Sequence, residues 1–135
     1  MELVYDYHHL IERKRTDLLD EKGGIVLWGI YDFAFKYRTR IFNCSDEEVA
    51  YVEKDIAADE DIVNICDSAG KKIDALVRAD GRLYLEKEGL LFSGDLREGK
   101  IEDYLRINEG RLMVERKEDL LKAAALLFSL VEIDR

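Results

Sequence analysis

The chain has 135 residues, 47% of them hydrophobic, and its 21 basic and 30 acidic side chains give a formal net charge of −9. This length suits a single domain with one core, which we expect to span residues 1–135, and the apolar content excludes a disordered chain. The negative charge argues against nucleic acid as a partner, because a phosphate-rich surface repels a negative protein.

The N-terminal residues and the two cysteines point to a cytoplasmic protein. Residues 1–6 (Met-Glu-Leu-Val-Tyr-Asp) lack the basic segment and the apolar core of a secretory signal. Cys44 and Cys66 have neither the density of a disulfide scaffold nor the Cys-x-x-Cys spacing of a metal or redox site. We expect both to be buried structural thiols, since the acidic residues 46–48 beside Cys44 disfavour a reactive thiolate.

The first element carries two adjacent histidines and a basic cluster. On a strand, His8 and His9 point to opposite faces, and no third metal ligand is identifiable near them, so we expect neither a metal site nor a cofactor. Arg13, Lys14 and Arg15 place three cations together against an acidic background.

Three short apolar segments recur at a spacing of 24 residues, beginning at Ile25, Val49 and Ile73. Each segment follows a turn-like polar cluster. A period in this range indicates one supersecondary unit used repeatedly, and the turn residues favour a β-hairpin.

Residues 35–42 show the alternation of a strand. One side of this strand holds Phe35, Tyr37, Thr39 and Ile41, and the other holds Lys36, Arg38 and Arg40. We expect the strand to pair with residues 49–53 across the polar loop at residues 43–48.

Further turn signals predict hairpins in series, as in a meander or barrel. The predicted hairpins join residues 62–66 to 72–77, residues 73–77 to 83–85, and residues 104–107 to 111–116.

Two polar segments are interpreted as solvated surface loops. Residues 94–100 match the glycine and lysine spacing of a phosphate-binding loop, but Ile101 stands where a Ser or Thr hydroxyl should reach Mg²⁺. Asp55 and residues 59–61 place four carboxylates close together, and a chain this acidic produces such neighbours without selection for catalysis.

Residues 120–131 form an apolar run that we expect to be a buried helix. On a helical projection, Glu118, Lys122, Ser129 and Glu132 share one narrow stripe and leave the remaining circumference apolar. Such a helix must be covered on several sides, and a curved β-sheet wrapped around it would provide the cover.

The sequence therefore predicts a mainly β fold of the α+β kind: an antiparallel β-hairpin meander or barrel around a buried C-terminal helix. Asp119 is placed to cap the first turn of that helix. The helix is shorter than the roughly 20 apolar residues of a membrane span, so we do not expect an integral membrane protein.

The order of these parts carries a family resemblance. A strand leads through the turn at residues 20–24 (Asp-Glu-Lys-Gly-Gly) into residues 25–28 (Ile-Val-Leu-Trp), and an aromatic, basic strand and a second copy of the unit follow at residues 32–42 and 46–54. The late strand at residues 111–117 and the apolar ending at residues 123–134 complete the pattern. In this order the chain resembles the tubby C-terminal-like superfamily, and within it the LURP-one-related and phospholipid-scramblase-like proteins.

The resemblance implies a closed β-barrel threaded by its C-terminal helix and a protein that acts through binding. We therefore expect a non-enzymatic binding or scaffold domain that contacts a phospholipid headgroup or an acidic protein partner, in the cytoplasm or peripherally at a membrane. The candidate binding residues are the cations Arg13, Lys14, Arg15, Lys36, Arg38 and Arg40. Cross-strand pairing of these cations with carboxylates on an exposed face is the structural alternative.

Two other function classes stay open at this point. One is a small-ligand-binding barrel or enzyme whose pocket assembles from distant residues such as His8, Tyr37, Tyr51 and Cys66. The other is an oligomer joined through a strand edge, so the sequence leaves the oligomeric state undecided.

Overall fold

The computed structural model describes residues 1–32, 34 and 37–135. These residues form twelve strands, two α-helices and a short 3-10 turn, η1 (Lys117–Asp119). The helices are α1 (Tyr7–Ile11) and α2 (Leu120–Glu132). The strands are β1 (Glu2–Val4), β2 (Thr16–Leu19), β3 (Ile25–Asp32), β4 (Arg38–Asn43), β5 (Glu48–Lys54), β6 (Asp61–Asp67), β7 (Lys72–Ala79), β8 (Arg82–Leu85), β9 (Leu90–Gly94), β10 (Glu98–Ile101), β11 (Leu105–Asn108) and β12 (Arg111–Val114).

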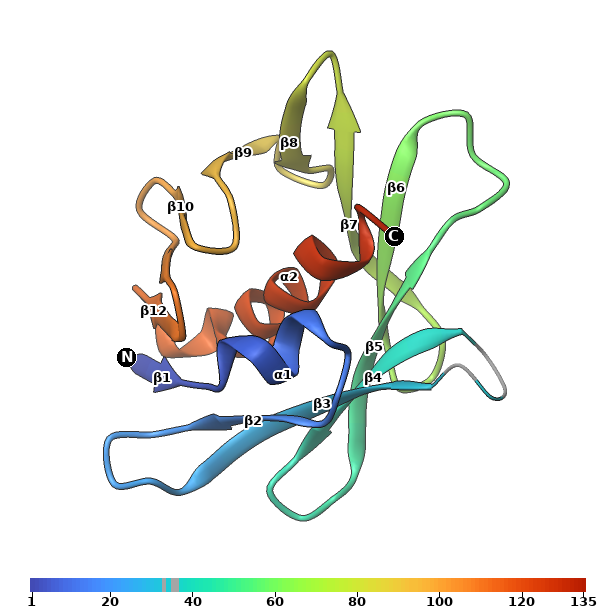
Figure 1. Ribbon diagram of the computed structural model, residues 1–135. Helices are drawn as coiled ribbons and strands as arrows, with labels where there is room; N and C mark the ends of the chain where they lie inside the picture. The colour runs from blue at the N-terminus through green and yellow to red at the C-terminus, as the bar shows by residue number, and fades with distance from the viewer. Residues whose placement is uncertain (33, 35–36) are drawn as a thin grey trace.

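The strands close into an antiparallel barrel, which confirms the predicted fold class (Figure 1). Every strand pairs with its neighbours in the chain, and β1 closes the barrel against β12 with Glu2 opposite Met113. The seam between β1 and β2 is short, because Val4 and Leu19 are its one paired position. Helix α1 connects these two strands and buries Leu10 in the core.

Helix α2 runs through the middle of the barrel, as the apolar run predicts (Figure 1). All residues of the helix from Ala123 to Glu132 are buried. Strand β3 approaches it so closely that a Cβ at Gly29 would lie 2.4 Å from Cζ of Phe128. Ser129, a fully buried member of the polar stripe, satisfies its hydroxyl by donating to the Ala125 carbonyl at 2.7 Å.

The 24-residue period corresponds to three successive hairpins, and the same kind of turn joins the two strands of each. Asp20, Asn43 and Asp67 each accept hydrogen bonds on one side-chain oxygen from the backbone N–H groups two and four residues later, at 2.9–3.0 Å. This side-chain capping satisfies the turn backbone locally. A register shift precedes each turn, in β2, β4 and β6. The hairpins predicted at residues 62–85 and 104–116 are confirmed, with β12 ending at Val114.

The strand predicted at residues 35–42 is present as β4, with its basic and core-facing sides alternating as expected. Thr39 and Ile41 are buried, whereas Arg38 and Arg40 are half-buried. Residues 35 and 36 lie outside the described residues. Tyr37 precedes the strand with a φ of 55° and is 68% exposed, so its predicted place in the alternation is wrong.

The expectation that His8 and His9 lie on a strand is also wrong, because they belong to α1. Asp6 caps that helix by accepting from the His9 backbone N–H at 3.0 Å. The chain leaves the helix at Arg13, which adopts a φ of 61°. The basic cluster therefore lies in the connection between α1 and β2.

Two local predictions near the C-terminal half need correction. Asp119 stands at the N-cap position of α2, but its carboxylate accepts from Arg116 Nε at 3.1 Å and makes no cap hydrogen bond. The loop predicted at residues 94–100 is shorter than expected, because Asp95 accepts from the backbone N–H groups of Arg97 and Glu98 and closes a tight turn into β10.

Candidate functional site

Arg38 lies on the outer surface of the barrel and stacks on an aromatic ring. Its guanidinium carbon is 3.8 Å from the ring centroid of Tyr51, on the neighbouring strand β5. Its Nη2 lies 3.6 Å from Glu53 Oε1. Its charge is therefore already compensated by a carboxylate and by the ring.

Arg40 occupies the same outer face one pleat further along β4. Its Nη2 donates to Glu48 Oε2 at 2.9 Å, and its Nη1 lies 3.8 Å from Asp32 Oδ2. The hydrogen bond to Glu48 raises the pKa of the Arg40 guanidinium above its ordinary value. Arg40 is thus held between two carboxylates.

Arg15 extends this row of arginines and aromatic rings toward β2. Its guanidinium carbon lies 3.9 Å from the Trp28 ring centroid, and its Nε donates to Asp17 Oδ1 at 2.8 Å. Trp28 in turn stacks on Phe42 with centroids 4.2 Å apart. We call Arg15, Trp28, Phe42, Arg40, Tyr51 and Arg38 the arginine–aromatic face.

Arg13 does not belong to this face and binds a side chain of the buried helix α2 instead. It stacks over Tyr31 at 4.0 Å and donates two hydrogen bonds to the carboxylate of Glu132 on α2, whose side chain is 5% exposed. Thr39 Oγ1 donates to the same carboxylate at 3.2 Å. These contacts hold the C-terminal end of α2 against β4 and the connection after α1.

The structure therefore divides the predicted basic residues between different places. Lys14 pairs with Glu12 at 3.0 Å, so each of the five predicted cations within the described chain has a carboxylate partner. The sixth, Lys36, lies outside the described residues. Cross-strand pairing, the structural alternative, is what the contacts show for Arg38 and Arg40, whose partners lie on β5. Arg13 pairs instead with α2, and Lys14 and Arg15 pair with carboxylates two residues away in the chain.

A second ion pair with a buried carboxylate holds the N-terminal end of α2. Lys122 Nζ lies 2.6 Å from Oδ2 of Asp74, whose side chain is fully buried. The other oxygen of Asp74 accepts from the backbone N–H groups of Ala75 and Lys87 at 2.8 and 3.0 Å. The polar groups inside the barrel thus anchor α2 at both ends.

Lysines without a carboxylate partner lie beside this end of the barrel. A groove of about 430 Å³ runs between the β6–β7 turn and the segment after β8, and we call it the lysine groove. It is lined by Lys71, Lys72, Ile73, Asp74, Glu86 and Lys87. Lys72 pairs with Glu86 at 3.1 Å, whereas Lys71 and Lys87 make no ion pair with a described residue. The sequence signal was the adjacent pair Lys71 and Lys72, but only the fold brings Lys87 to them.

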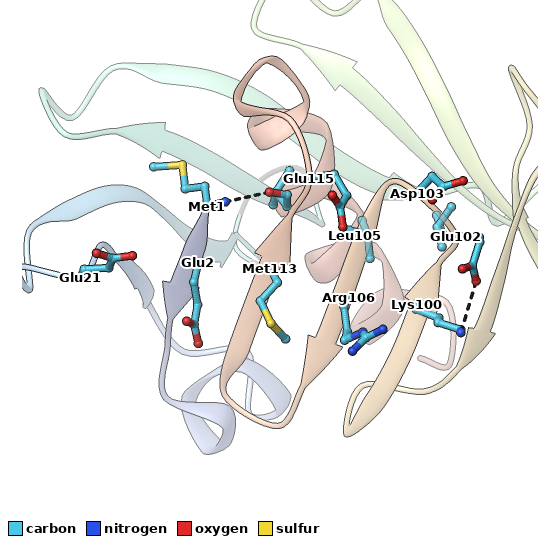
Figure 2. Close-up of a pocket in the computed structure, with 12 residues that line it drawn as sticks. Met1, Glu2, Glu21, Lys100, Glu102, Asp103, Leu105, Arg106, Met113 and Glu115 are labelled. Atoms are coloured by element: carbon cyan, nitrogen blue, oxygen red, sulfur yellow. Dashed lines mark hydrogen bonds and ion pairs between the residues drawn. The ribbon is translucent and has the colours of Figure 1, made fainter.

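A larger groove, of about 490 Å³, lies over β1, β12, β11 and β10 (Figure 2). We call it the acidic groove. Its lining includes the side chains of Glu2, Met113, Arg106 and Lys100, which come from four different strands. Sequence reasoning missed this groove, because its residues come from both ends of the chain.

The remaining predicted groups do not assemble into one site. Cys66 is buried, as expected, and lies opposite Tyr51, whose pKa is raised mainly by burial and also by the neighbouring thiol. Cys44 is exposed, so its predicted burial is wrong; it follows Asn43, whose side chain organises a surface turn. His8 lies in α1 and Tyr37 precedes β4.

No protein family, curated protein or solved structure matches this chain. The resemblance to the tubby C-terminal-like superfamily therefore stays a prediction, although the fold is a closed barrel around a helix. Among the described residues, neither helix has both the length and the apolar character needed to cross a membrane.

Proposed function

We propose that this protein is a non-enzymatic binding or scaffold domain that binds the anionic headgroup of a phospholipid on the outside of its barrel. The packing inside the barrel supports a site on the outside, because α2 fills the interior. The cavity between Leu10, Gly29 and Phe128 has a volume of about 10 Å³, which is no larger than one water molecule requires. This small volume supports ligand contacts on the outer surface or at the barrel ends.

The lysine groove is the proposed headgroup site, and its unpaired lysines are the observation that carries the proposal. An anion at Arg38 or Arg40 must first displace Glu53, or Glu48, from the guanidinium. Lys71 and Lys87 impose no such competition. A phosphate can therefore approach two free ammonium groups and Lys72 without breaking a described contact of Lys71 or Lys87.

The groove suits one headgroup better than a broad anionic surface. Each lysine near an anionic membrane contributes about 1 kcal/mol, whereas the net charge of −9 opposes the approach of the whole molecule. Membrane contact in this proposal is peripheral and depends on a highly charged headgroup such as a phosphoinositide.

Vesicle sedimentation tests this proposal. The native chain is expected to sediment with phosphatidylcholine vesicles that contain a phosphoinositide and to stay in solution with phosphatidylcholine alone. The variant Lys71→Gln/Lys87→Gln is expected to lose most of this binding. The matched variant Arg38→Gln/Arg40→Gln removes the same charge and is expected to retain it, because those arginines are already paired.

Two results would overturn the assignment. Absence of sedimentation by the native chain removes headgroup binding altogether. Loss of binding by the arginine variant alone, with an unchanged melting temperature, moves the site to the arginine–aromatic face. Soluble inositol phosphate as a competitor separates recognition of the headgroup from attraction to the vesicle surface.

A further inference from the structure

We propose that the acidic groove of Figure 2 is a docking surface for a basic segment of a partner protein. This surface is separate from the lysine groove, and the inference does not depend on headgroup binding. Cross-strand pairing sets one row of outward side chains across four strands. In order across the sheet, the row is Glu2, Met113, Arg106 and Lys100.

Carboxylates exceed cations around the acidic groove. The carboxylates are Glu2, Glu21, Glu102, Asp103 and Glu115. The cations are Lys100, Arg106 and the amine of Met1, which donates to the Val114 carbonyl at 2.9 Å. Lys100 pairs with Glu102 at 3.2 Å, and Glu2 pairs with Arg111 at 3.4 Å. Glu21, Asp103 and Glu115 have no ion pair with a described residue, and neither does Arg106, so the lining as a whole keeps two more carboxylates than cations.

The acidic groove also offers an apolar contact at its centre. Met113 is half-buried in the middle of the row, opposite Glu2. Met1, just before the neighbouring strand, is 47% exposed and its side chain points away from Met113 (Figure 2). Methionine adapts to the shape of a bound side chain because its thioether is flexible and polarisable. The geometry fits an extended segment that places one apolar residue on Met113 and directs basic residues toward Glu21 and Glu115.

Charge selects this occupant over the others. A second copy of the chain carries the same net charge of −9, and anionic lipids and nucleic acids are repelled by unpaired carboxylates. A cationic segment is instead attracted both by the whole molecule and by the groove. Arg106, which has no ion pair with a described residue, is available to donate to a backbone carbonyl of the segment.

The probe is a fluorescein-labelled peptide of sequence Lys-Lys-Leu-Lys-Lys, measured by fluorescence anisotropy at low ionic strength. The native chain is expected to bind it with a Kd below 1 mM, and the Kd is expected to rise with added salt. The variant Glu21→Lys/Glu115→Lys should raise the Kd at least tenfold. The matched variant Asp59→Lys/Glu60→Lys changes the net charge equally on a distant exposed turn and should raise the Kd less than threefold.

The apolar contact has its own test, because Met113→Ala leaves the charge unchanged and should weaken binding by about fivefold. Thermal melts establish that each variant is folded. Equal losses in the two lysine variants would overturn the proposal, because they would show attraction to the net charge alone. A native Kd above 1 mM would overturn it as well.

Discussion

At the scale of single residues, we expect the largest change in the free energy of unfolding when the buried carboxylate of Glu132 loses its partner. Glu132 is 5% exposed in its side chain, whereas its partner Arg13 is 29% exposed. Removing Arg13 leaves a carboxylate buried without its cation, and removing Glu132 leaves a guanidinium that can turn to water. Removing Arg13 and removing Glu132 should therefore lower the free energy of unfolding by different amounts.

We expect Arg13→Met to lower the free energy of unfolding by about 3–5 kcal/mol, and Glu132→Gln to lower it by clearly less. Urea unfolding at neutral pH measures both. In Glu132→Gln, Thr39 can still donate to the amide oxygen, and this hydrogen bond limits the loss of stability. A smaller loss for Arg13→Met than for Glu132→Gln would show that Glu132 is not stabilised mainly by this pair.

Tyr104 gives a prediction about alkaline pH. Burial is the main cause that raises its pKa well above the ordinary value of 10.0, and its buried hydroxyl has no hydrogen-bond partner among the described residues. The unfolded chain therefore releases this proton first, so stability is intact below pH 10 and falls as the pH rises above it.

The variant Tyr104→Phe should lose less stability than the native chain between pH 9 and pH 11, by about 1 kcal/mol. At pH 7 it should change stability by less than about 1 kcal/mol, because no hydrogen bond to a described residue is lost. Urea midpoints across this pH range provide the measurement. An unchanged alkaline loss would assign the effect to other tyrosines, such as Tyr5, whose pKa is also raised by burial.

At the scale of elements, the contact between β3 and α2 depends on the absence of a side chain at Gly29. A Cβ there would lie 2.4 Å from Cζ of Phe128, and the ring is only 3% exposed. We expect Gly29→Ala to lower the free energy of unfolding by about 1–3 kcal/mol through overpacking.

A double-mutant cycle tests the origin of that loss. Phe128→Leu should recover part of it in the Gly29→Ala background while it destabilises the native background, which gives a favourable coupling energy. Additive losses would mean that strain in β3, and not the approach of the helix, accounts for the effect.

Helix α2 is held in position by its polar ends as well as its apolar surface. Lys122 meets Asp74 near the first turn, and Glu132 meets Arg13 at the last. The apolar surface supplies the drive to bury the helix, but it is non-directional. The ion pairs at opposite ends therefore select one depth and one rotation of the helix in the barrel.

At the scale of the whole molecule, α2 fills the inside of the barrel, and both proposed binding surfaces therefore lie outside it. The lysine groove and the acidic groove have opposite charge: Lys71 and Lys87 line the first, and Glu21 and Glu115 line the second. If both proposals hold, one barrel would bind an anionic headgroup and a basic protein segment on separate surfaces.

Much of the fold follows from local patterns in the sequence. The alternation at residues 35–42 predicts a strand with Thr39 and Ile41 on one side, and β4 buries both of them. The apolar run at residues 120–131 predicts a buried helix, which is α2. Both predictions succeed because period and turn chemistry act over a few residues. The site predictions were less complete, because the same pattern that placed Arg38 and Arg40 on the surface could not show their carboxylate partners.

Local sequence patterns predicted the β4–β5, β6–β7, β7–β8 and β11–β12 hairpins, the buried C-terminal helix and the alternation of β4. The closure of the barrel, in which Met1 meets Val114 from 113 positions away, could not be predicted from these patterns, and neither could the approach of Lys87 to Lys71. The reason is physical: hydrophobic period and turn residues act between near neighbours, whereas ion pairs and grooves depend on the register of strands that are distant in the chain.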